Sequence, residues 1–214
     1  MKKYQAVLFD LDGTLVDTAA DMELAINLMR GQYDLKPLST GFLRTSVSQG
    51  AKAMLEVSFG EFEPSRFSQL RQEFLELYSQ NLAKCSKPYP GIDDLLDTMD
   101  KDGVAWGIVT NKPGWLSEPL LKELGYWDRS KITISGDTLQ HPKPHPMPMQ
   151  AALGALEMAS QDTLYLGDAL VDVKAAAAVN MQCIVAGWGY LNEDPLLWEP
   201  MAIIQQPDEL LQWL

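Results

Sequence analysis

The 214-residue sequence contains few cysteines, few basic residues and few histidines. Cys85 and Cys183 are too few for a disulfide scaffold, and we expect two buried reduced thiols, a disulfide or a reactive thiol being the alternative. Seventeen Lys and Arg residues oppose 29 Asp and Glu residues, so the net charge is −12. This charge repels nucleic acid and anionic membrane surfaces, which excludes both as favoured partners.

Long apolar runs are also absent. The first apolar run, residues 6–9, stops at Asp10 and is far too short for the core of a signal peptide. The longest uncharged stretch, residues 175–192, contains Asn180 and Gln182 and is better explained as a helix end, a buried strand and a loop. We therefore expect a cytoplasmic protein with no membrane partner, and no pattern in the sequence specifies an oligomeric state.

What the sequence does contain is an alternation of short apolar strands with helical patterns. We predict strands at residues 4–9, 104–110, 131–135, 163–167 and 182–186, and a weaker one at 202–204. Helical patterns cover residues 92–100, 115–124, 149–159 and 170–179. Such an alternation implies right-handed crossovers. The predicted class is therefore α/β, with a Rossmann-like doubly wound parallel sheet.

Residues 18–83 interrupt this alternation. They contain helical patterns at 19–30, 49–57 and 64–82, separated by proline and glycine, and no convincing strand. The simplest interpretation is an inserted all-helical cap domain over residues 17–85. Residues 1–16 and 86–214 would then form the α/β core.

Two aspartates directly follow the first predicted strand. Asp10 and Asp12 are two residues apart, so their side chains begin on the same face of the sheet at its carboxyl edge. Two such carboxylates repel each other unless a cation joins them, and hard oxygen ligands suit Mg²⁺. Gly13 permits close approach of the backbone, and Thr14 offers a hydroxyl. The alternative is an ordinary Asx turn at the end of a strand.

Polar groups also follow the second predicted strand and occur in a proline-rich loop. Thr110 and Asn111 can hold phosphate oxygens, although Asn111 can equally begin a helix. Lys143 lies in the run 141–146, whose prolines restrict the backbone, so its ammonium is either held beside a phosphate or solvated. His141 and His145 are four residues apart, a spacing that would suit a metal site on a helix. The prolines of this run exclude such a helix.

The fourth predicted strand ends at another acid. Asp168 follows residues 163–167, and Asp172 lies one helical turn later on the same face. Asp168 either caps the following helix or binds a metal. Because the parallel strands end at one sheet edge, we expect the polar groups that follow them to converge there.

These motifs in this order resemble the haloacid dehalogenase superfamily of phosphohydrolases over essentially the whole chain. The resemblance is carried by Asp-Leu-Asp-Gly-Thr at residues 10–14, Thr110-Asn111, Lys143, and Gly167-Asp168 with Asp172. It implies a phosphomonoester hydrolase that acts on a small phosphorylated metabolite. Asp10 would be the nucleophile that forms an aspartyl phosphate, and Asp12 the general acid and base.

The same resemblance implies Mg²⁺ as the cofactor. The ion would be held by Asp10, Asp168 and the backbone carbonyl of Asp12, while Asp172 orients the metal shell. Thr110, Asn111 and Lys143 would bind the phosphate oxygens.

The helical insertion looks like the cap of phosphoglycolate phosphatases. Residues 43–55 and the loop 187–190 look somewhat more like N-acetylmuramic acid 6-phosphate phosphatases, which leaves that activity as the alternative. The candidate substrate contacts of the cap are Arg44, Ser48, Gly50 and Lys52. The alternative is that these residues belong to its solvated surface.

Two other classes fit less well. A receiver-like signalling module lacks a long helical insertion, and a phosphosugar mutase requires substrate-orienting cap residues that we do not identify. Neither Gly-x-Gly-x-x-Gly nor a Walker-type Gly-Lys-Ser/Thr pattern is present, so dinucleotide binding and P-loop chemistry have no support.

Overall fold

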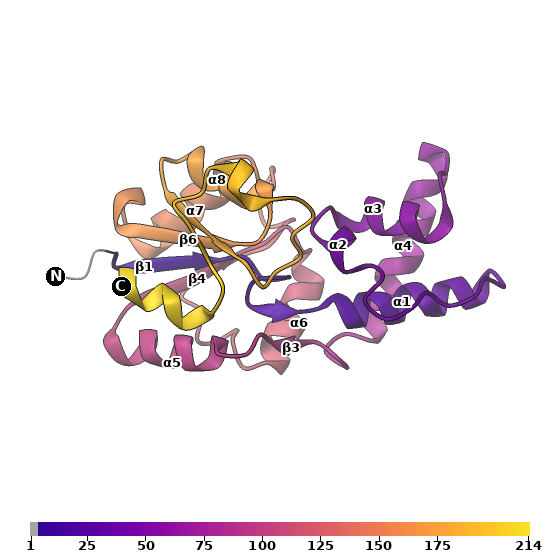
Figure 1. Ribbon diagram of the computed structural model, residues 1–214, viewed down its shortest axis with the longest axis horizontal. Helices are drawn as coiled ribbons and strands as arrows, with labels where there is room; N and C mark the ends of the chain where they lie inside the picture. The colour runs from indigo at the N-terminus through magenta and orange to yellow at the C-terminus, as the bar shows by residue number, and fades with distance from the viewer. Residues whose placement is uncertain (1–3) are drawn as a thin grey trace.

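The computed structural model describes residues 4–214, so the first three residues of the predicted core lie outside it (Figure 1). Six parallel strands form one sheet in the order β5-β4-β1-β6-β7-β8. They are β1 (Ala6–Phe9), β4 (Ala105–Val109), β5 (Thr133–Ile134), β6 (Thr163–Gly167), β7 (Gln182–Ala186) and β8 (Ala202–Ile204). The predicted α/β class with a parallel sheet is confirmed.

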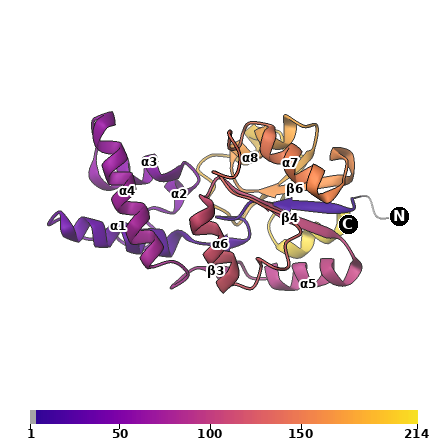
Figure 2. The same ribbon diagram turned by 180° about the vertical axis from the view of Figure 1, so that it is seen from behind.

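Helices cover both faces of this sheet, as a doubly wound fold requires (Figures 1 and 2). One face carries α5 (Ile92–Asp102) and α6 (Gly114–Glu123); the other carries α7 (Met147–Leu156) and α8 (Leu170–Ala177). The central strand β1 serves both layers: Val7 and Phe9 pack with the α5 side, whereas Leu8 packs with the α7 side. Short 3-10 helices lie at Ser160–Asp162, Pro195–Trp198 and Pro207–Trp213.

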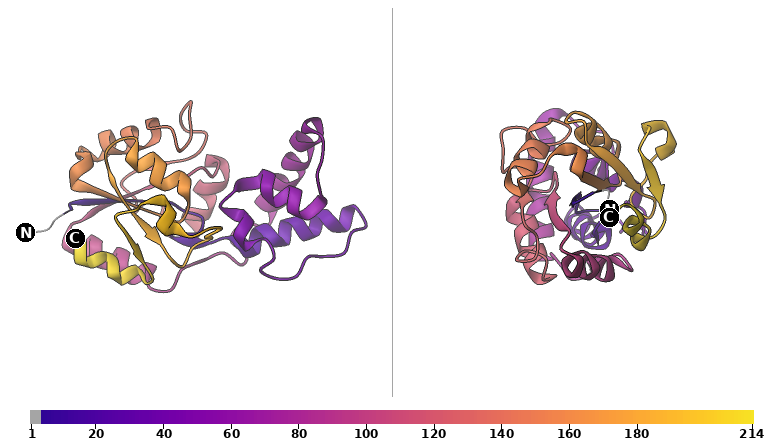
Figure 3. Two further views of the ribbon diagram at one scale, coloured as in Figure 1. Left: turned by 45° about the horizontal axis from the view of Figure 1, so that its top comes forward. Right: turned by 90° about the vertical axis from the view of Figure 1, so that its left-hand side faces the viewer.

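Four further helices lie together at one end of the molecule, apart from the sheet (Figure 3). We call them the helical insertion: α1 (Ala19–Gln32), α2 (Arg44–Val47), α3 (Gly50–Phe59) and α4 (Pro64–Gln80). Their apolar side chains, among them Ile26, Met29, Leu55 and Phe74, form one cluster, which Leu116 of α6 and Tyr190 join from the α/β core. Helix α2 was not predicted, because four residues are too few for a helical periodicity.

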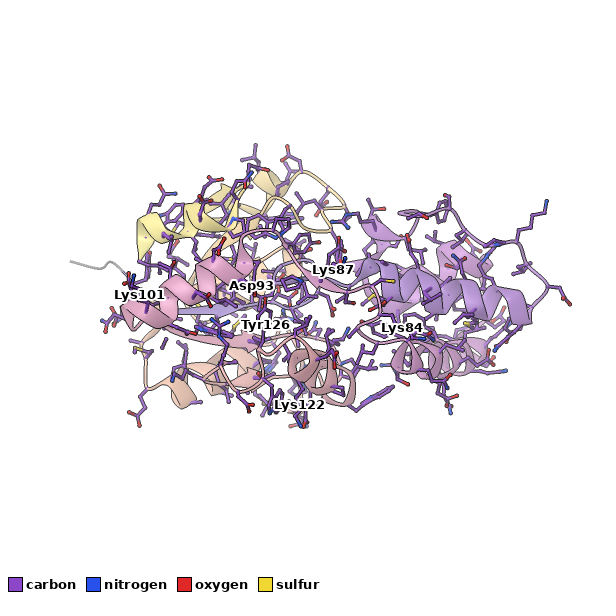
Figure 4. The ribbon with its side chains drawn as sticks, turned by 90° about the horizontal axis from the view of Figure 1, so that it is seen from below. Lys84, Lys87, Asp93, Lys101, Lys122 and Tyr126 are labelled. Carbon is purple, nitrogen blue, oxygen red and sulfur yellow. The ribbon has the colours of Figure 1, made fainter. Side chains whose placement is uncertain are left out.

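A two-stranded ribbon joins the insertion to the core. Here β2 (Val16–Asp17) leaves the core and pairs antiparallel with β3 (Lys87–Pro88), which returns to it; Lys84 and Lys87 mark this return in Figure 4. The buried carboxylate of Asp21 on α1 accepts hydrogen bonds from the backbone N–H groups of Cys85 and Ser86, at 2.7 and 3.1 Å. Strands of two residues have no alternation, so the sequence did not predict this ribbon.

The cysteine prediction was right for one residue and wrong for the other. Both thiols are free, and Cys183 is buried in β7. Cys85 is exposed, because it lies in the connection that follows α4, where only its backbone is held by Asp21. No helix among residues 4–214 is long and apolar enough to cross a membrane.

Candidate active site

Three adjacent strands place the predicted polar groups at one edge of the sheet. Asp10 follows β1, Thr110 follows β4 on one side of it, and Asp168 follows β6 on the other. A cavity of about 530 Å³ lies between this edge and the helical insertion, and Asp10, Asp12, Thr110 and Asp168 all line it. The expected convergence of these groups is present in the structure.

Lys143 is buried within this cluster, so it is not a solvated lysine. Its Nζ donates hydrogen bonds to Asp10 Oδ1 at 2.8 Å, to Asp172 Oδ1 at 2.7 Å and to the Tyr165 hydroxyl at 2.8 Å. The Asn111 side chain is bonded to the backbone of Lys143, accepting from its N–H at 2.9 Å and donating to its carbonyl at 3.0 Å. Asn111 therefore positions Lys143, and a direct contact of Asn111 with phosphate stays a prediction.

Three carboxylates form a compact buried group. One oxygen from each of Asp10, Asp168 and Asp172 lies within 4.8 Å of the others. Burial raises the pKa of Asp10 to about 6, against the attraction of Lys143, and Asp172 raises it further by repulsion. Burial also raises the pKa of Asp168 well above its ordinary value, and repulsion from Asp10 and Asp172 adds to this. Both pKa values are therefore raised mainly because burial disfavours the charged carboxylates, and repulsion within the group is a further cause.

This group fits a hard divalent cation. Its donors are carboxylate oxygens, and a cation would relieve the repulsion that raises the pKa of Asp10 and Asp168. Asp10 and Asp168 line the cavity, whereas Asp172 does not: its Oδ1 pairs with Lys143, and its Oδ2 accepts from the backbone N–H of Ala169 at 3.0 Å. The oxygens of Asp168 accept from uncharged donors, the Thr14 hydroxyl at 3.2 Å and the backbone N–H of Tyr190 at 2.7 Å. Asp10 and Asp168 are therefore the carboxylates best placed to hold such an ion, and Asp172 holds Lys143.

Asp12 points toward the helical insertion. Its Oδ1 accepts hydrogen bonds from Thr18 Oγ1 at 2.7 Å and from Lys112 Nζ at 3.0 Å. Thr18 directly precedes α1, so this carboxylate lies where the core and the insertion meet. The side chain therefore lies at the wall of the cavity, on the side of the insertion.

Lys112 was missed by the sequence analysis. It is buried, and besides Asp12 it contacts Tyr78 of α4, with its Nζ 2.6 Å from the hydroxyl and 4.4 Å from the ring centroid. Burial lowers the pKa of Lys112, but the attraction of Asp12 and Tyr78 outweighs burial and the net pKa is raised. The available signal was the position of Lys112 directly after Thr110-Asn111, at the carboxyl end of β4.

The candidate contacts on the insertion separate into two groups. Ser48, Gly50 and Lys52 line the cavity. Arg44 does not, because its guanidinium donates to Asp17 Oδ2 at 2.7 Å and to the Tyr89 hydroxyl at 3.0 Å beside the two-stranded ribbon. The structure thus places Arg44 at the junction of insertion and core.

The comparisons with known proteins agree with this geometry. The family model described as haloacid dehalogenase-like hydrolase matches residues 7–186. The chain belongs to this family. A phosphoglycolate phosphatase of Xanthomonas campestris pv. campestris (strain 8004) is 38% identical over 212 residues, which cover 98% of this chain and 96% of the relative.

Two further relatives extend the comparison. An N-acetylmuramic acid 6-phosphate phosphatase of Pseudomonas aeruginosa is 36% identical over 215 residues, covering 99% of this chain and 95% of the relative. The crystal structure of a predicted phosphoglycolate phosphatase from Haemophilus somnus 129PT has a TM-score of 0.87 and 26% identity, covering 99% of this chain and 98% of that one. The predicted enzyme class, a phosphomonoester hydrolase of the haloacid dehalogenase family, is confirmed.

Proposed function

We propose that this haloacid dehalogenase-like hydrolase is Mg²⁺-dependent and cleaves a small phosphorylated metabolite through an aspartyl phosphate on Asp10. The observation that carries the proposal is the buried contact between Asp10 and Lys143 at 2.8 Å, beside Asp168 and at the edge of a cavity. A carboxylate that attacks a phosphate faces like-charge repulsion, so the nucleophile needs positive charge beside it. The site provides that charge within hydrogen-bond distance.

The chain's own residues divide the work around Asp10. The Lys143 ammonium binds phosphate oxygens where negative charge increases in the transition state, and Thr110 adds its hydroxyl from the next strand. Asp172, Tyr165 and Asn111 hold Lys143 in place.

Mg²⁺ would be held by Asp10, Asp168 and the backbone carbonyl of Asp12. When bound, it would supply Lewis-acid neutralisation of the phosphate. Asp12 would give a proton to the leaving oxygen and later take one from the water that hydrolyses the aspartyl phosphate. Thr18 and Lys112 support this by holding the Asp12 carboxylate at the cavity wall.

We further propose that residues 17–85 act as the cap that selects the leaving group. The core motifs would contact only phosphate and metal, whereas Ser48, Gly50 and Lys52 line the cavity from the insertion. The names of the relatives support phosphoglycolate as the expected substrate and N-acetylmuramic acid 6-phosphate as the alternative substrate. A cavity of about 530 Å³ is large for a two-carbon leaving group, which favours the alternative.

Turnover of the two named compounds separates these candidates, with inorganic phosphate as the measured product. Activity on neither compound would reject both substrates. An isomerised product in place of free phosphate would indicate a mutase.

Removal of divalent cations is expected to abolish hydrolysis of p-nitrophenyl phosphate. Without a cation, the phosphate would meet the carboxylates of Asp10 and Asp168 with Lys143 as the main compensating charge. The measurement is release of p-nitrophenol before and after EDTA, followed by addition of excess Mg²⁺. Activity that persists in EDTA would contradict the proposed cofactor.

The stabilisation by Mg²⁺ is expected to grow as the pH rises through about 6. The pKa of Asp10 is raised from 3.8 to about 6 in the folded protein. Between these values the folded, metal-free chain binds a proton that the unfolded chain has lost, so this group's contribution to stability declines as the pH rises. Mg²⁺ requires ionised carboxylates and therefore competes with that proton.

The measurement is the melting temperature in Mg²⁺ and in EDTA at about pH 5 and about pH 7. We expect Mg²⁺ to raise the melting temperature above its value in EDTA by more at about pH 7 than at about pH 5. This rise should be smaller in Asp10→Asn than in the unmodified protein. Equal differences at both pH values would show that these carboxylates do not bind the ion.

A further inference from the structure

A second cleft adjoins the catalytic cavity. It has a volume of about 730 Å³ and lies between α4 of the helical insertion and the loops that follow β4 and β5. The α4 and α6 helices that flank it lie at the junction of the insertion and the core in Figures 1 and 2. The two spaces share four lining residues, Arg71, Leu75, Asn111 and Pro113. The cleft and the catalytic cavity therefore lie against each other at these four residues.

An aromatic ring lines this cleft and is left half exposed. Trp115 lies in the first turn of α6 and retains 50% of its exposure. Among residues 4–214, no hydrogen-bond partner is present for its indole N–H. A half-exposed indole is suited to stack on the apolar face of a ring, while its N–H remains free to bond a hydroxyl. Ser68, Gln72 and Asp137 add polar groups along the same cleft.

The guanidinium of Arg71 has no partner in the described part of the chain and lies where the cavity and the cleft adjoin. In the described part of the chain, Arg71 of α4 makes no hydrogen bond or ion pair, although it lines both the cavity and the cleft. The two acids that line the cleft form no ion pair with Arg71: Glu76 accepts from Gln72 at 2.9 Å, and Asp137 accepts from the backbone N–H of Gly114 at 2.7 Å. Arg71 is thus available to an anion on a ligand, and its planar fork matches a carboxylate.

The catalytic cavity contains a further unsatisfied group on the same side. The Ser48 Oγ is buried and has no hydrogen-bond partner within residues 4–214. A buried hydroxyl without a partner costs free energy, which a ligand that bonds to it would recover. The wall formed by the insertion therefore offers an unpaired cation and an unpaired hydroxyl to the leaving group.

We propose that Trp115 and Arg71 form a subsite for the part of the leaving group that is remote from the phosphate, and that this leaving group is a sugar ring carrying a carboxylate. The ring would stack on Trp115 and the carboxylate would pair with Arg71. This inference rests on the proposed phosphatase reaction at Asp10. The leaving group of phosphoglycolate has two carbons and no ring for Trp115 to stack on, so the subsite selects for an acidic sugar phosphate.

The test compares substrates that differ by one feature each. The probes are N-acetylmuramic acid 6-phosphate, N-acetylglucosamine 6-phosphate, which lacks the carboxylate, and phosphoglycolate, which lacks the ring. We expect Trp115→Ala to lower the ratio of kcat/KM for the acidic sugar over phosphoglycolate by about tenfold, through KM. Arg71→Ala is expected to lower the preference for the acidic over the neutral sugar by about the same factor. Trp115→Phe and Arg71→Lys should retain part of each preference.

Matched controls lie on the same helices. Arg66→Ala removes an arginine of α4 that lines neither space, and Lys122→Ala removes a solvent-exposed lysine of α6 that is labelled in Figure 4. Both should leave all three substrates unaffected.

Three results would overturn the subsite. The first is an equal loss of kcat/KM on all three substrates in Trp115→Ala. The second is an unchanged preference for the acidic sugar phosphate in both Trp115→Ala and Arg71→Ala. The third is no turnover of the acidic sugar phosphate by a protein that hydrolyses p-nitrophenyl phosphate. Failure of the phosphatase proposal itself gives a different result, which is p-nitrophenyl phosphate hydrolysis that does not depend on Asp10.

Discussion

Replacement of Asp10 by Asn is expected to abolish Mg²⁺-dependent hydrolysis of p-nitrophenyl phosphate while the protein stays folded. The amide has nearly the shape of the carboxylate but cannot attack phosphorus, so kcat should fall by at least ~10⁴-fold. The fold should persist because Lys143 keeps its second carboxylate partner, Asp172, at 2.7 Å. The measurements are kcat and a thermal unfolding curve for the same preparation.

A matched Asp→Asn control is available on the surface of the core. The Asp97 side chain is 70% exposed and pairs only with Arg129 among the ion pairs of residues 4–214, so Asp97→Asn should keep full activity. Turnover near the normal value in a folded Asp10→Asn variant would show that another group is the nucleophile.

Replacement of Lys143 by Met is expected to damage both stability and activity. Asp172 is fully buried and would lose its cationic partner, and an uncompensated buried charge costs about 3–5 kcal/mol in unfolding free energy. The phosphate would lose its main protein cation, so kcat should fall by about 10²–10³-fold. Urea denaturation in EDTA measures the first effect, because no metal can then compensate the charge.

A double variant separates charge from packing at this position. Adding Asp172→Asn to Lys143→Met removes the stranded carboxylate, and we expect it to recover much of the lost stability but none of the activity. Lys101→Met, on the exposed surface of α5 in Figure 4, provides the lysine control. If Lys143→Met costs no more than Lys101→Met, the buried ion pair has no role in stability.

Much of the core could be predicted because its signals are local. The predicted strands 163–167, 182–186 and 202–204 match the structure residue for residue. Apolar runs that are buried in a parallel sheet differ sharply from the polar turns that bound them. Helix ends were less certain. The predicted helix 149–159 begins at Met147, because Pro148 is accommodated in the first turn, and it ends at Leu156, where the following Glu157 adopts a left-handed backbone conformation.

Contacts between the insertion and the core could not be predicted in the same way. Lys112 of the core contacts Tyr78, which lies 34 residues earlier in α4 of the insertion. No periodicity in the sequence relates these two positions. Arg44 is a candidate substrate contact because it lies near a turn that opens a helix. The sequence did not predict that its guanidinium would bond to Asp17 and Tyr89. These partners depend on how α2 and α4 sit against the core.

The sequence by itself determined which polar groups of the core meet, because Asp10, Thr110 and Asp168 each follow a buried strand directly. The strands of a parallel sheet bring such positions to one edge whatever surrounds them. Tertiary structure alone decided which further side chains line the spaces beside that edge. Arg71 of the insertion, and Lys112 and Trp115 of the core, obtain their places from the packing of the insertion against the core, and that packing determines the space available to the leaving group.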